Sequence, residues 1–207
     1  MTDSDRDKTG RAEVMVATQN RGKLREIREI LEGSGVVLLS LDDYPDLPEV
    51  VEDGETLAEN ALKKARSICA WTGHVTIADD TGLEVEALDG RPGVHSARYA
   101  GDGAGDADRR AKLLAELGGV PEEGRGAAFR CVMAIATPDG REELVEGECR
   151  GMICEEPKGA NGFGYDPLFL VPEYGMTFAE IAPEVKNRIS HRGRALAGLM
   201  KVLPAYL

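Results

Sequence analysis

The sequence contains no apolar run approaching the roughly 20 residues that a membrane helix needs. We therefore expect neither a membrane-spanning protein nor one with an obvious secretory signal peptide. Cysteine is also scarce: the four cysteines include no C-x-x-C pair, and three of them lie in apolar patterns where another small hydrophobic residue would serve as well. Their placement favours free thiols in a reducing cytoplasm over zinc ligands or disulfides.

Positively charged residues are fewer than negatively charged ones: 25 Lys and Arg residues and 37 Asp and Glu residues give a net charge of -12. This balance argues against a nucleic-acid-binding surface, because duplex binding needs phosphate-neutralising cations over a broad face. A small anionic ligand is compatible with the composition if a local cluster of Lys and Arg, or a divalent metal, offsets the surrounding negative field.

The rest of the composition is that of an ordinary globular protein. The 207 residues are 42% hydrophobic and 30% charged, which suits one domain, or one domain with two lobes, around its own apolar core. Residues 1–11 are polar and without period, so we expect a disordered tail there. A single folding unit is expected over residues 12–207.

Hydrophobic periodicity predicts strands that alternate with helices. Strands are expected at residues 14–17, 75–78, 82–88, 127–136 and 141–151, and briefly after a glycine-rich loop at 159–167. Helices are expected within residues 22–35, 56–73, 106–119 and 190–203. Thr56 and Glu59 have the spacing of a capping box, and residues 137–140 suit the tight turn of a hairpin. This order indicates an α/β fold with a mixed central sheet and flanking helices.

The stretch ATQNRGK, residues 17–23, joins the first strand to the first helix. Backbone N–H groups and the helix dipole would point at this loop, so a phosphate could bind there. It is not a Walker A loop, because Leu24 stands where that motif needs Ser or Thr. The alternative is an ordinary helix cap made by Asn20 or Thr18.

The stretch HVTIADDTGLEV, residues 74–85, places two carboxylates side by side where a strand is expected to end. Neighbouring strand residues point to opposite faces, so one of Asp79 and Asp80 is expected to face a cleft while the other braces a turn at Thr81–Gly82. Mg²⁺ binds through one or two carboxylates together with phosphates and water, and such a strand end suits it. The alternative is a turn-forming Asp-Asp-Thr-Gly sequence without a ligand.

The stretch GANGFGYDP, residues 159–167, combines glycines with two aromatic rings. Its glycines permit close backbone approach, and Phe163 and Tyr165 offer flat faces on which a base could stack. Asp166 is held extended by the proline that follows it. A plain glycine loop is the alternative.

The stretch KNRISHRGRAL, residues 186–196, is the most basic part of an acidic chain. Ser190 is positioned to cap the last helix, and His191, between Ser and Arg, is better explained by a site than by packing. The alternative is a solvated basic helix face that balances the acidic surface.

In this order, the four stretches resemble motifs of the non-canonical purine nucleoside triphosphate pyrophosphatases, also called the inosine triphosphatase or Ham1-like family. ATQNRGK resembles ATxNxGK, and IADDTGLEVEALDGRPGVHSARYAG resembles ADDSGLxVxALxGxPGxYSARYAG. GFGYDPLF and SHRGRAL match the two remaining motifs. Four long motifs in the right order, from about residue 14 to residue 203, make a chance resemblance improbable.

The resemblance implies one ITPase-like pyrophosphatase domain with two lobes around a cleft. It also implies a homodimer and Mg²⁺-dependent hydrolysis of ITP, dITP and XTP to the monophosphate and pyrophosphate. By the same resemblance, the triphosphate is held by Thr18, Gln19, Asn20, Arg21, Gly22 and Lys23. The remaining substrate contacts are Thr81, Phe163, Gly164, Tyr165, Asp166, Lys186, His191 and Arg192. The resemblance also implies that Asp80 is both the metal ligand and the proton acceptor.

A second metal carboxylate is expected from the acidic loop at residues 40–55. Glu52 is the candidate, and Glu49 and Glu55 are alternatives. The chain departs from the family pattern at Gln19, often Gly, at Thr81, usually Ser, and at His95, usually Tyr. None of these changes removes a phosphate or metal contact, although Gln19 and His95 could alter the shape of their loops.

Donor-only groups give a physical reason for the implied base preference. Hypoxanthine and xanthine carry a carbonyl at C6 where adenine carries an amine, and Lys186 and Arg192 can donate to that oxygen. Two other functions remain open at this point. One is a pyrophosphatase for modified pyrimidine or methylated nucleotides, as in the similarly folded Maf-like proteins, and the other is a sensor that binds a nucleotide without hydrolysing it.

Overall fold

The computed structural model describes residues 10–47 and 50–207. Its strands are β1 (Glu13–Val16), β2 (Val37–Ser40), β3 (Val75–Val85), β4 (Pro92–Gly93), β5 (Gly126–Ala136), β6 (Glu142–Ile153), β7 (Phe169–Val171) and β8 (Met176–Thr177). Its α-helices are α1 (Arg21–Ile30), α2 (Leu57–Thr72), α3 (Asp106–Glu116), α4 (Pro183–Ile189) and α5 (His191–Val202). The tail predicted over residues 1–11 lies outside the described residues except for Gly10 and Arg11, which are exposed.

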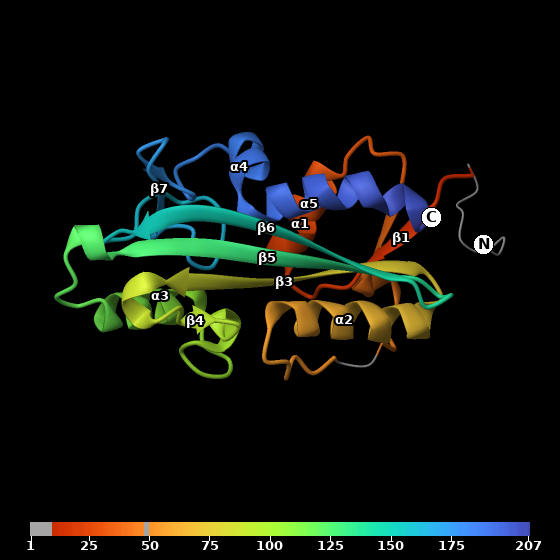
Figure 1. Ribbon diagram of the computed structural model, residues 1–207, viewed down its shortest axis with the longest axis horizontal. Coiled ribbons are helices and arrows are strands. Elements are labelled where there is room, and N and C mark those ends of the chain that lie inside the picture. Colours follow the sequence, from red (N-terminus) through yellow and green to blue (C-terminus); the bar gives the residue numbers. More distant parts are fainter. Residues whose placement is uncertain (1–9, 48–49) are drawn as a thin grey trace. The chain divides into compact units, whose positions relative to one another are not determined.

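The strands form one mixed sheet in the order β2-β1-β3-β5-β6-β7-β8, with β4 paired to β3 (Figure 1). β1 runs parallel to both β2 and β3. The pairs β3–β4, β6–β7 and β7–β8 are antiparallel. β5 and β6 are joined through the predicted tight turn, where the Thr137 N–H donates to the Arg141 carbonyl at 3.0 Å. The predicted mixed α/β fold is therefore confirmed.

The chain folds into two compact units. The first comprises the described residues up to Asp80 together with residues 131–147 and 195–207, and the second comprises residues 81–130 and 148–194. Strands β3, β5 and β6 and helix α5 contribute residues to both units. One ITPase-like domain over residues 12–207 stays a prediction.

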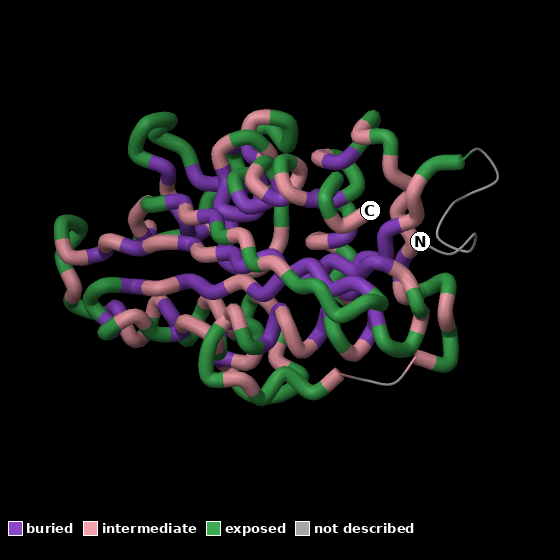
Figure 2. Tube along the Cα trace, turned by 45° about the vertical axis from the view of Figure 1, so that its right-hand side comes forward, coloured by how far each residue is buried: buried purple, intermediate pink, exposed green. Residues whose placement is uncertain are grey.

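In the first unit, helices cover both faces of the sheet. α1 and α5 pack on one face through a cluster that includes Ile27, Ile77 and Leu199. α2 packs on the other face through a cluster that includes Ala65 and Ala78. Figure 1 shows α5 and α2 on opposite sides of these strands, and Figure 2 shows that buried residues concentrate along the strands. Successive residues of β3 therefore face different helix layers.

This arrangement brings two of the motifs to one edge of the sheet. β1 and β3 are parallel neighbours, and the helices that connect the first three strands lie on opposite faces, which makes a topological switch point between β1 and β3. The Ala17 N–H still donates to the Ile77 carbonyl at 2.8 Å. Residues 18–23 therefore leave β1 at the level where β3 carries Asp79 and Asp80, and ligands of such sheets bind at this position.

The second unit has its own core, formed by the second half of β3, the start of β5 and the segments around β7 and α3. Its centre is aromatic: the ring centroids of Phe129 and Phe169 lie 4.7 Å apart, and those of Phe169 and Phe178 lie 4.9 Å apart. Leu113 of α3 is fully buried in the same cluster. This core supports the glycine-rich loop, since Tyr165 and Leu168 belong to it.

The helix signals in the sequence are confirmed for α2. The Thr56 hydroxyl accepts from the Glu59 N–H at 3.1 Å, and the Glu59 carboxylate accepts from the Thr56 N–H at 3.3 Å. Gly73 ends the helix in the left-handed region at φ 73°, which glycine adopts without steric cost. The predicted cap of α5 is also present, because the Ser190 hydroxyl accepts from the Gly193 N–H at 3.1 Å.

One local prediction was wrong, and β2 and α4 were not predicted. The turn at Thr81–Gly82 is absent, because β3 continues without a break for 11 residues and pairs with β4 through Leu83 and Glu84. β2 was missed, although it follows a helix and pairs with β1 as the next strand of a parallel unit should. α4 was also missed, and its Pro at the first helical turn is a start signal that could have revealed it.

The four cysteines are free thiols, three of them buried, as the sequence predicted. Burial raises the pKa of the Cys149 and Cys154 thiols, so neither is an activated nucleophile. Among residues 10–47 and 50–207, no helix combines the length and the apolar character that crossing a bilayer requires.

Candidate active site

The adjacent acids Asp79 and Asp80 point to opposite faces of β3, as strand geometry predicted. Asp79 lies on the face of α1, where its Oδ2 is 3.0 Å from Nζ of Lys23. Asp80 lies on the face of α2, where its Oδ2 accepts from Nδ2 of Asn60 at 3.2 Å and its Oδ1 is 3.5 Å from Nζ of Lys64. Asp79 therefore does not brace a turn, because no turn is present. It holds the lysine of the first motif instead.

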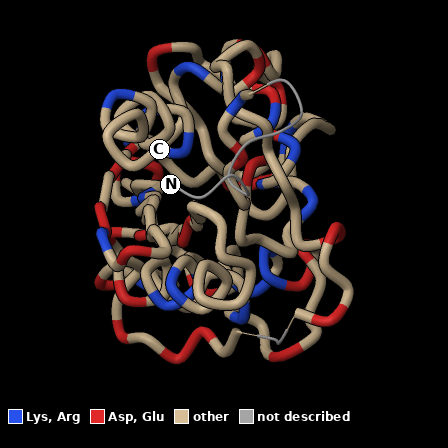
Figure 3. Tube along the Cα trace, turned by 90° about the vertical axis from the view of Figure 1, so that its right-hand side faces the viewer, with Lys and Arg blue, Asp and Glu red and all other residues tan. Residues whose placement is uncertain are grey.

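Glu52, Asn60, Lys64 and Asp80 form the Asp80 cluster. Nζ of Lys64 lies between the two carboxylates, 3.1 Å from Oε2 of Glu52 and 3.5 Å from Oδ1 of Asp80. Oδ1 of Asn60 accepts from the Gly54 N–H at 2.8 Å, so the same amide side chain joins Asp80 to the loop that carries Glu52. Figure 3 shows the acidic residues that recur along this loop, between β2 and α2.

Burial and neighbouring charges act in opposite directions on the pKa values of Asp80 and Lys64. Burial raises the pKa of Asp80 above its ordinary value, although the ammonium groups of Lys64 and Lys23 oppose the shift. Burial also works to lower the pKa of Lys64, but the carboxylates of Asp80, Asp79 and Glu52 outweigh it, so the pKa of Lys64 is raised. Lys64 is therefore a firmly charged cation, and Asp80 is a better proton acceptor than an exposed carboxylate.

The carboxylates of the cluster suit a hard cation. Within residues 10–47 and 50–207, no three His, Cys, Asp or Glu side chains gather closely enough to hold a metal by themselves. Mg²⁺ needs only one or two carboxylates when substrate phosphates and water complete its shell, and Glu52 and Asp80 already converge on one positive charge, the Lys64 ammonium. Glu52 and Glu55 are both exposed, and Glu52 is the one whose carboxylate reaches Lys64. Glu49 lies outside the described residues.

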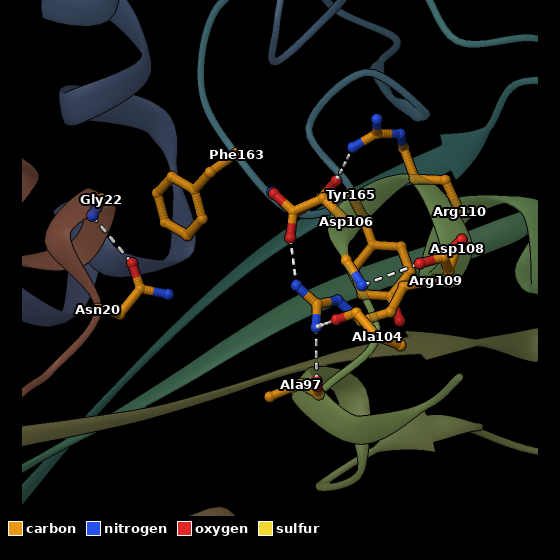
Figure 4. Close-up of polar contacts among 12 residues, drawn as sticks. Asn20, Gly22, Ala97, Ala104, Asp106, Asp108, Arg109, Arg110, Phe163 and Tyr165 are labelled. Atoms are coloured by element: carbon orange, nitrogen blue, oxygen red, sulfur yellow. Dashed lines mark hydrogen bonds and ion pairs between the residues drawn. The ribbon is translucent and has the colours of Figure 1, made fainter. Parts of the chain in front are cut away.

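The first motif opens α1, with Asn20 as its cap. Oδ1 of Asn20 accepts from the Gly22 N–H at 2.9 Å (Figure 4). It also accepts from the Lys23 N–H at 3.1 Å. Thr18 in turn accepts from the Asn20 N–H at 3.2 Å. Asn20 therefore caps α1, and a phosphate at this loop would compete with it for two of the amides. Gln19, Asn20 and Arg21 are exposed, and their contacts with substrate stay predictions.

In the second unit, the glycine-rich loop is fixed by a buried ion pair. Nζ of Lys186 lies 2.6 Å from Oδ2 of Asp166, and both side chains are almost fully buried. The same oxygen accepts from the Phe163 N–H at 2.9 Å. Gly162 passes so close that a Cβ there would meet Oδ2 of Asp166 at 2.1 Å, which explains the glycine at this position.

Two cations lie over the ring of Phe163. Nζ of Lys186 is 5.2 Å from the ring centroid, and Cζ of Arg192 is 5.7 Å from it. Phe163 is half-buried, whereas Tyr165 is buried, with its hydroxyl donating to the Ser96 carbonyl at 3.0 Å. Phe163 is thus the ring of this loop with an accessible face, and Tyr165 anchors the loop to the core.

His191 and Arg192 of the last motif belong to the second unit. His191 is buried and stacks on Phe129, with centroids 4.5 Å apart and planes 15° apart, so its ring contributes to packing as well as to any site. Arg192, also buried, donates from Nη2 to the Thr81 hydroxyl at 3.2 Å. Gly193 has no room for a side chain, since a Cβ would lie 1.9 Å from the Asn187 carbonyl oxygen.

Sequence reasoning missed Asn60 and Lys64. Both are buried, and they lie four residues apart on α2, beside the apolar residues Ala61 and Ala65. Two polar residues on the apolar face of a helix indicate a polar partner nearby, because buried polar side chains need hydrogen-bond partners. Their partner Asp80 is 20 and 16 residues away in the sequence, so only the fold identifies it.

The sequence profile of the Ham1 family matches residues 14–202. A "dITP/XTP pyrophosphatase" of Geobacter sulfurreducens is 57% identical over 184 residues, covering 89% of this chain and 92% of the relative. A protein of the same name from Desulforamulus reducens is 53% identical and covers 92% and 94% of the two chains. The solved structure of a HAM1 protein from Coxiella burnetii superposes with a TM-score of 0.84 at 42% identity, covering 93% of this chain and 98% of that one.

Proposed function

Because this chain belongs to the Ham1 family, we propose that it hydrolyses the non-canonical purine nucleotides ITP, dITP and XTP to the monophosphate and pyrophosphate. The observation that carries the proposal is the Asp80 cluster, in which the buried carboxylate of Asp80 and the carboxylate of Glu52 converge on the buried lysine Lys64. The relatives named as dITP/XTP pyrophosphatases support the same activity. Such an enzyme removes deaminated purines from the nucleotide pool.

Cleavage of a phosphoanhydride needs charge neutralisation and an oriented water more than covalent chemistry. Lys23 and Lys64 supply two positive charges beside Asp79 and Asp80. We propose that Glu52 and Asp80 hold Mg²⁺, which when bound neutralises phosphate charge. Asp80 accepts the proton of the attacking water at its carboxylate, which Asn60 and Lys64 hold in place.

Base choice is assigned to the second unit. Lys186 and Arg192 carry only donors, and both lie over the half-exposed ring of Phe163. A 6-oxopurine stacked on that ring would accept from them, whereas the 6-amine of adenine is itself a donor and would not. The substrate contacts proposed for Thr81 and His191 belong to the same unit. A homodimer in a reducing cytoplasm completes the proposal, and the four free thiols suit that compartment.

A nucleotide panel tests the class of reaction, the bond cleaved and the base preference together. We expect ITP, dITP and XTP to release pyrophosphate with kcat/KM at least about 10²-fold above ATP, which carries a 6-amine, and EDTA to abolish the reaction until Mg²⁺ is restored. Release of inorganic phosphate alone, or equal turnover of ATP, would contradict the proposal. Faster turnover of dTTP or UTP would favour a Maf-like activity, and tight binding without hydrolysis would favour a sensor.

Replacing Asn60 with Asp should lower kcat for ITP by about 10- to 100-fold, the usual loss when a residue that orients a metal-binding carboxylate is changed. The new carboxylate can still accept from the Gly54 N–H, but its other oxygen would face Oδ2 of Asp80 and repel it. Lys63→Ala is the control, because Lys63 ties the same loop to α2 through the exposed Asp53. Equal losses in both variants would mean that Asn60 acts only by holding the loop.

A further inference from the structure

Side chains of α3 hold both backbone polar groups of Gly164, the residue between Phe163 and Tyr165. The Gly164 N–H donates to Oδ2 of Asp106 at 2.7 Å, and Nη1 of Arg110 donates to the Gly164 carbonyl at 2.7 Å. Asp106 and Arg110 are 58 and 54 residues from Gly164 in the sequence. We call these two side chains the Gly164 clamp, and the motifs discussed above include neither of them.

The clamp is itself braced. Arg109 pairs with Asp106 and donates from Nη1 to the carbonyls of Ala97 and Ala104, each at 2.8 Å (Figure 4). Burial works to raise the pKa of Asp106, but the hydrogen bond from the Gly164 N–H and the neighbouring guanidinium of Arg109 outweigh it and hold the pKa below its ordinary value. Asp106 is therefore a charged acceptor, whose hydrogen bonds are stronger than those of a neutral one.

The position of the clamp gives it control over Phe163. Gly164 lies in the left-handed region at φ +60°, with nothing within 4 Å of where its Cβ would be, so its own packing does not fix its backbone. Asp166 accepts from the N–H of Phe163 itself, and the clamp holds the N–H and the carbonyl of the next residue, Gly164. Between these bonds, the ring of Phe163 is kept beneath Lys186 and Arg192.

We propose that Asp106 and Arg110 are positioning residues that set base selectivity, because they hold the Phe163 ring and the two cations over it in the geometry that receives a 6-oxopurine. The inference rests on the proposed pyrophosphatase function. Neither residue belongs to the Asp80 cluster, and both contact the backbone of Gly164. The clamp is therefore assigned to holding the base and not to breaking the bond.

Arg110→Ala tests the clamp, with Lys112→Ala as a matched control. Both variants remove one hydrogen bond from an α3 cation to a backbone carbonyl, since Nζ of Lys112 donates to the Tyr99 carbonyl at 2.8 Å. In Arg110→Ala we expect KM for ITP to rise about five- to twentyfold, as small misplacements of binding groups do, with kcat within about twofold and the preference for ITP over ATP reduced. Arg110→Lys, which keeps a cationic donor, should recover part of the KM.

Amide hydrogen exchange of the nucleotide-free protein tests whether the clamp holds the glycine-rich loop, separately from whether it sets base selectivity. Exchange in residues 163–166 should be faster in Arg110→Ala and in Asp106→Ala than in the wild type or in Lys112→Ala. Unchanged exchange would mean that Asp106 and Arg110 do not hold the loop backbone, and would overturn the proposal. Faster exchange with an unchanged KM and base preference, or equal kinetic changes in Arg110→Ala and Lys112→Ala, would overturn the clamp's role in selectivity. A wild type that releases no pyrophosphate from ITP would instead refute the proposed function.

Discussion

Replacing Asp80 with Asn is expected to lower pyrophosphate release from ITP by about 10²- to 10⁴-fold, the usual contribution of a positioned proton acceptor. Asn has nearly the same shape and cannot take up the proton. The variant should fold, because Lys64 keeps its ion pair with Glu52 at 3.1 Å and no charge is left buried without a counter-charge. Single-turnover rates with saturating ITP and Mg²⁺ measure the effect, and thermal unfolding verifies the fold.

Asp79→Asn is the matched control, because it makes the same chemical change one residue away on the opposite face of β3. Asp79 pairs with Lys23 at 3.0 Å, and its side chain is fully buried. Loss of that pair should disturb the lysine of the first motif without removing the proton acceptor, so the expected loss of turnover is smaller than in Asp80→Asn. The reverse order would mean that the catalytic face of the strand is the one toward α1.

The sequence predicted those features of the fold that depend on short stretches of chain. The capping box at Thr56 and Glu59 and the hairpin turn at residues 137–140 were readable because their stabilising bonds join residues three to four positions apart. The false turn at Thr81–Gly82 shows the limit of such reading. Its composition favours a turn, but pairing of β3 with β4 keeps the chain extended, and that partner is defined only by the tertiary fold.

The candidate site was predicted to the extent that its motifs are contiguous. The opposite faces of Asp79 and Asp80 followed from strand geometry, and the family resemblance singled out Asp80. The partners that tune these residues come from elsewhere in the chain: Lys64 reaches Asp80 from α2, and Asp106 reaches Gly164 from α3. Local patterns carry no information about which distant helix faces a given loop, so such contacts had to be read from the structure.

Replacing Lys186 with Met is expected to lower the free energy of unfolding by about 3–5 kcal/mol, because it leaves the buried carboxylate of Asp166 without its counter-charge. The two groups are 2.6 Å apart, with side chains only 6% and 5% exposed. Asp166 also holds the Phe163 N–H at 2.9 Å, so the loop should loosen together with the ion pair. Urea-induced unfolding, followed by circular dichroism, measures the loss.

The double variant Asp166→Asn/Lys186→Met separates stability from base recognition. With both charges of the pair removed it should recover most of the lost stability, since replacing both members of a buried ion pair costs far less than removing one. The amide that replaces the Asp166 carboxylate keeps an oxygen that can accept from the Phe163 N–H, so the loop should re-form. Activity should not return: kcat/KM for ITP should stay at least about tenfold below the wild type, because the donor proposed for the 6-oxo group is gone. If the double variant regained wild-type kcat/KM together with its stability, Lys186 would be a partner of Asp166 alone, and base recognition would fall to Arg192.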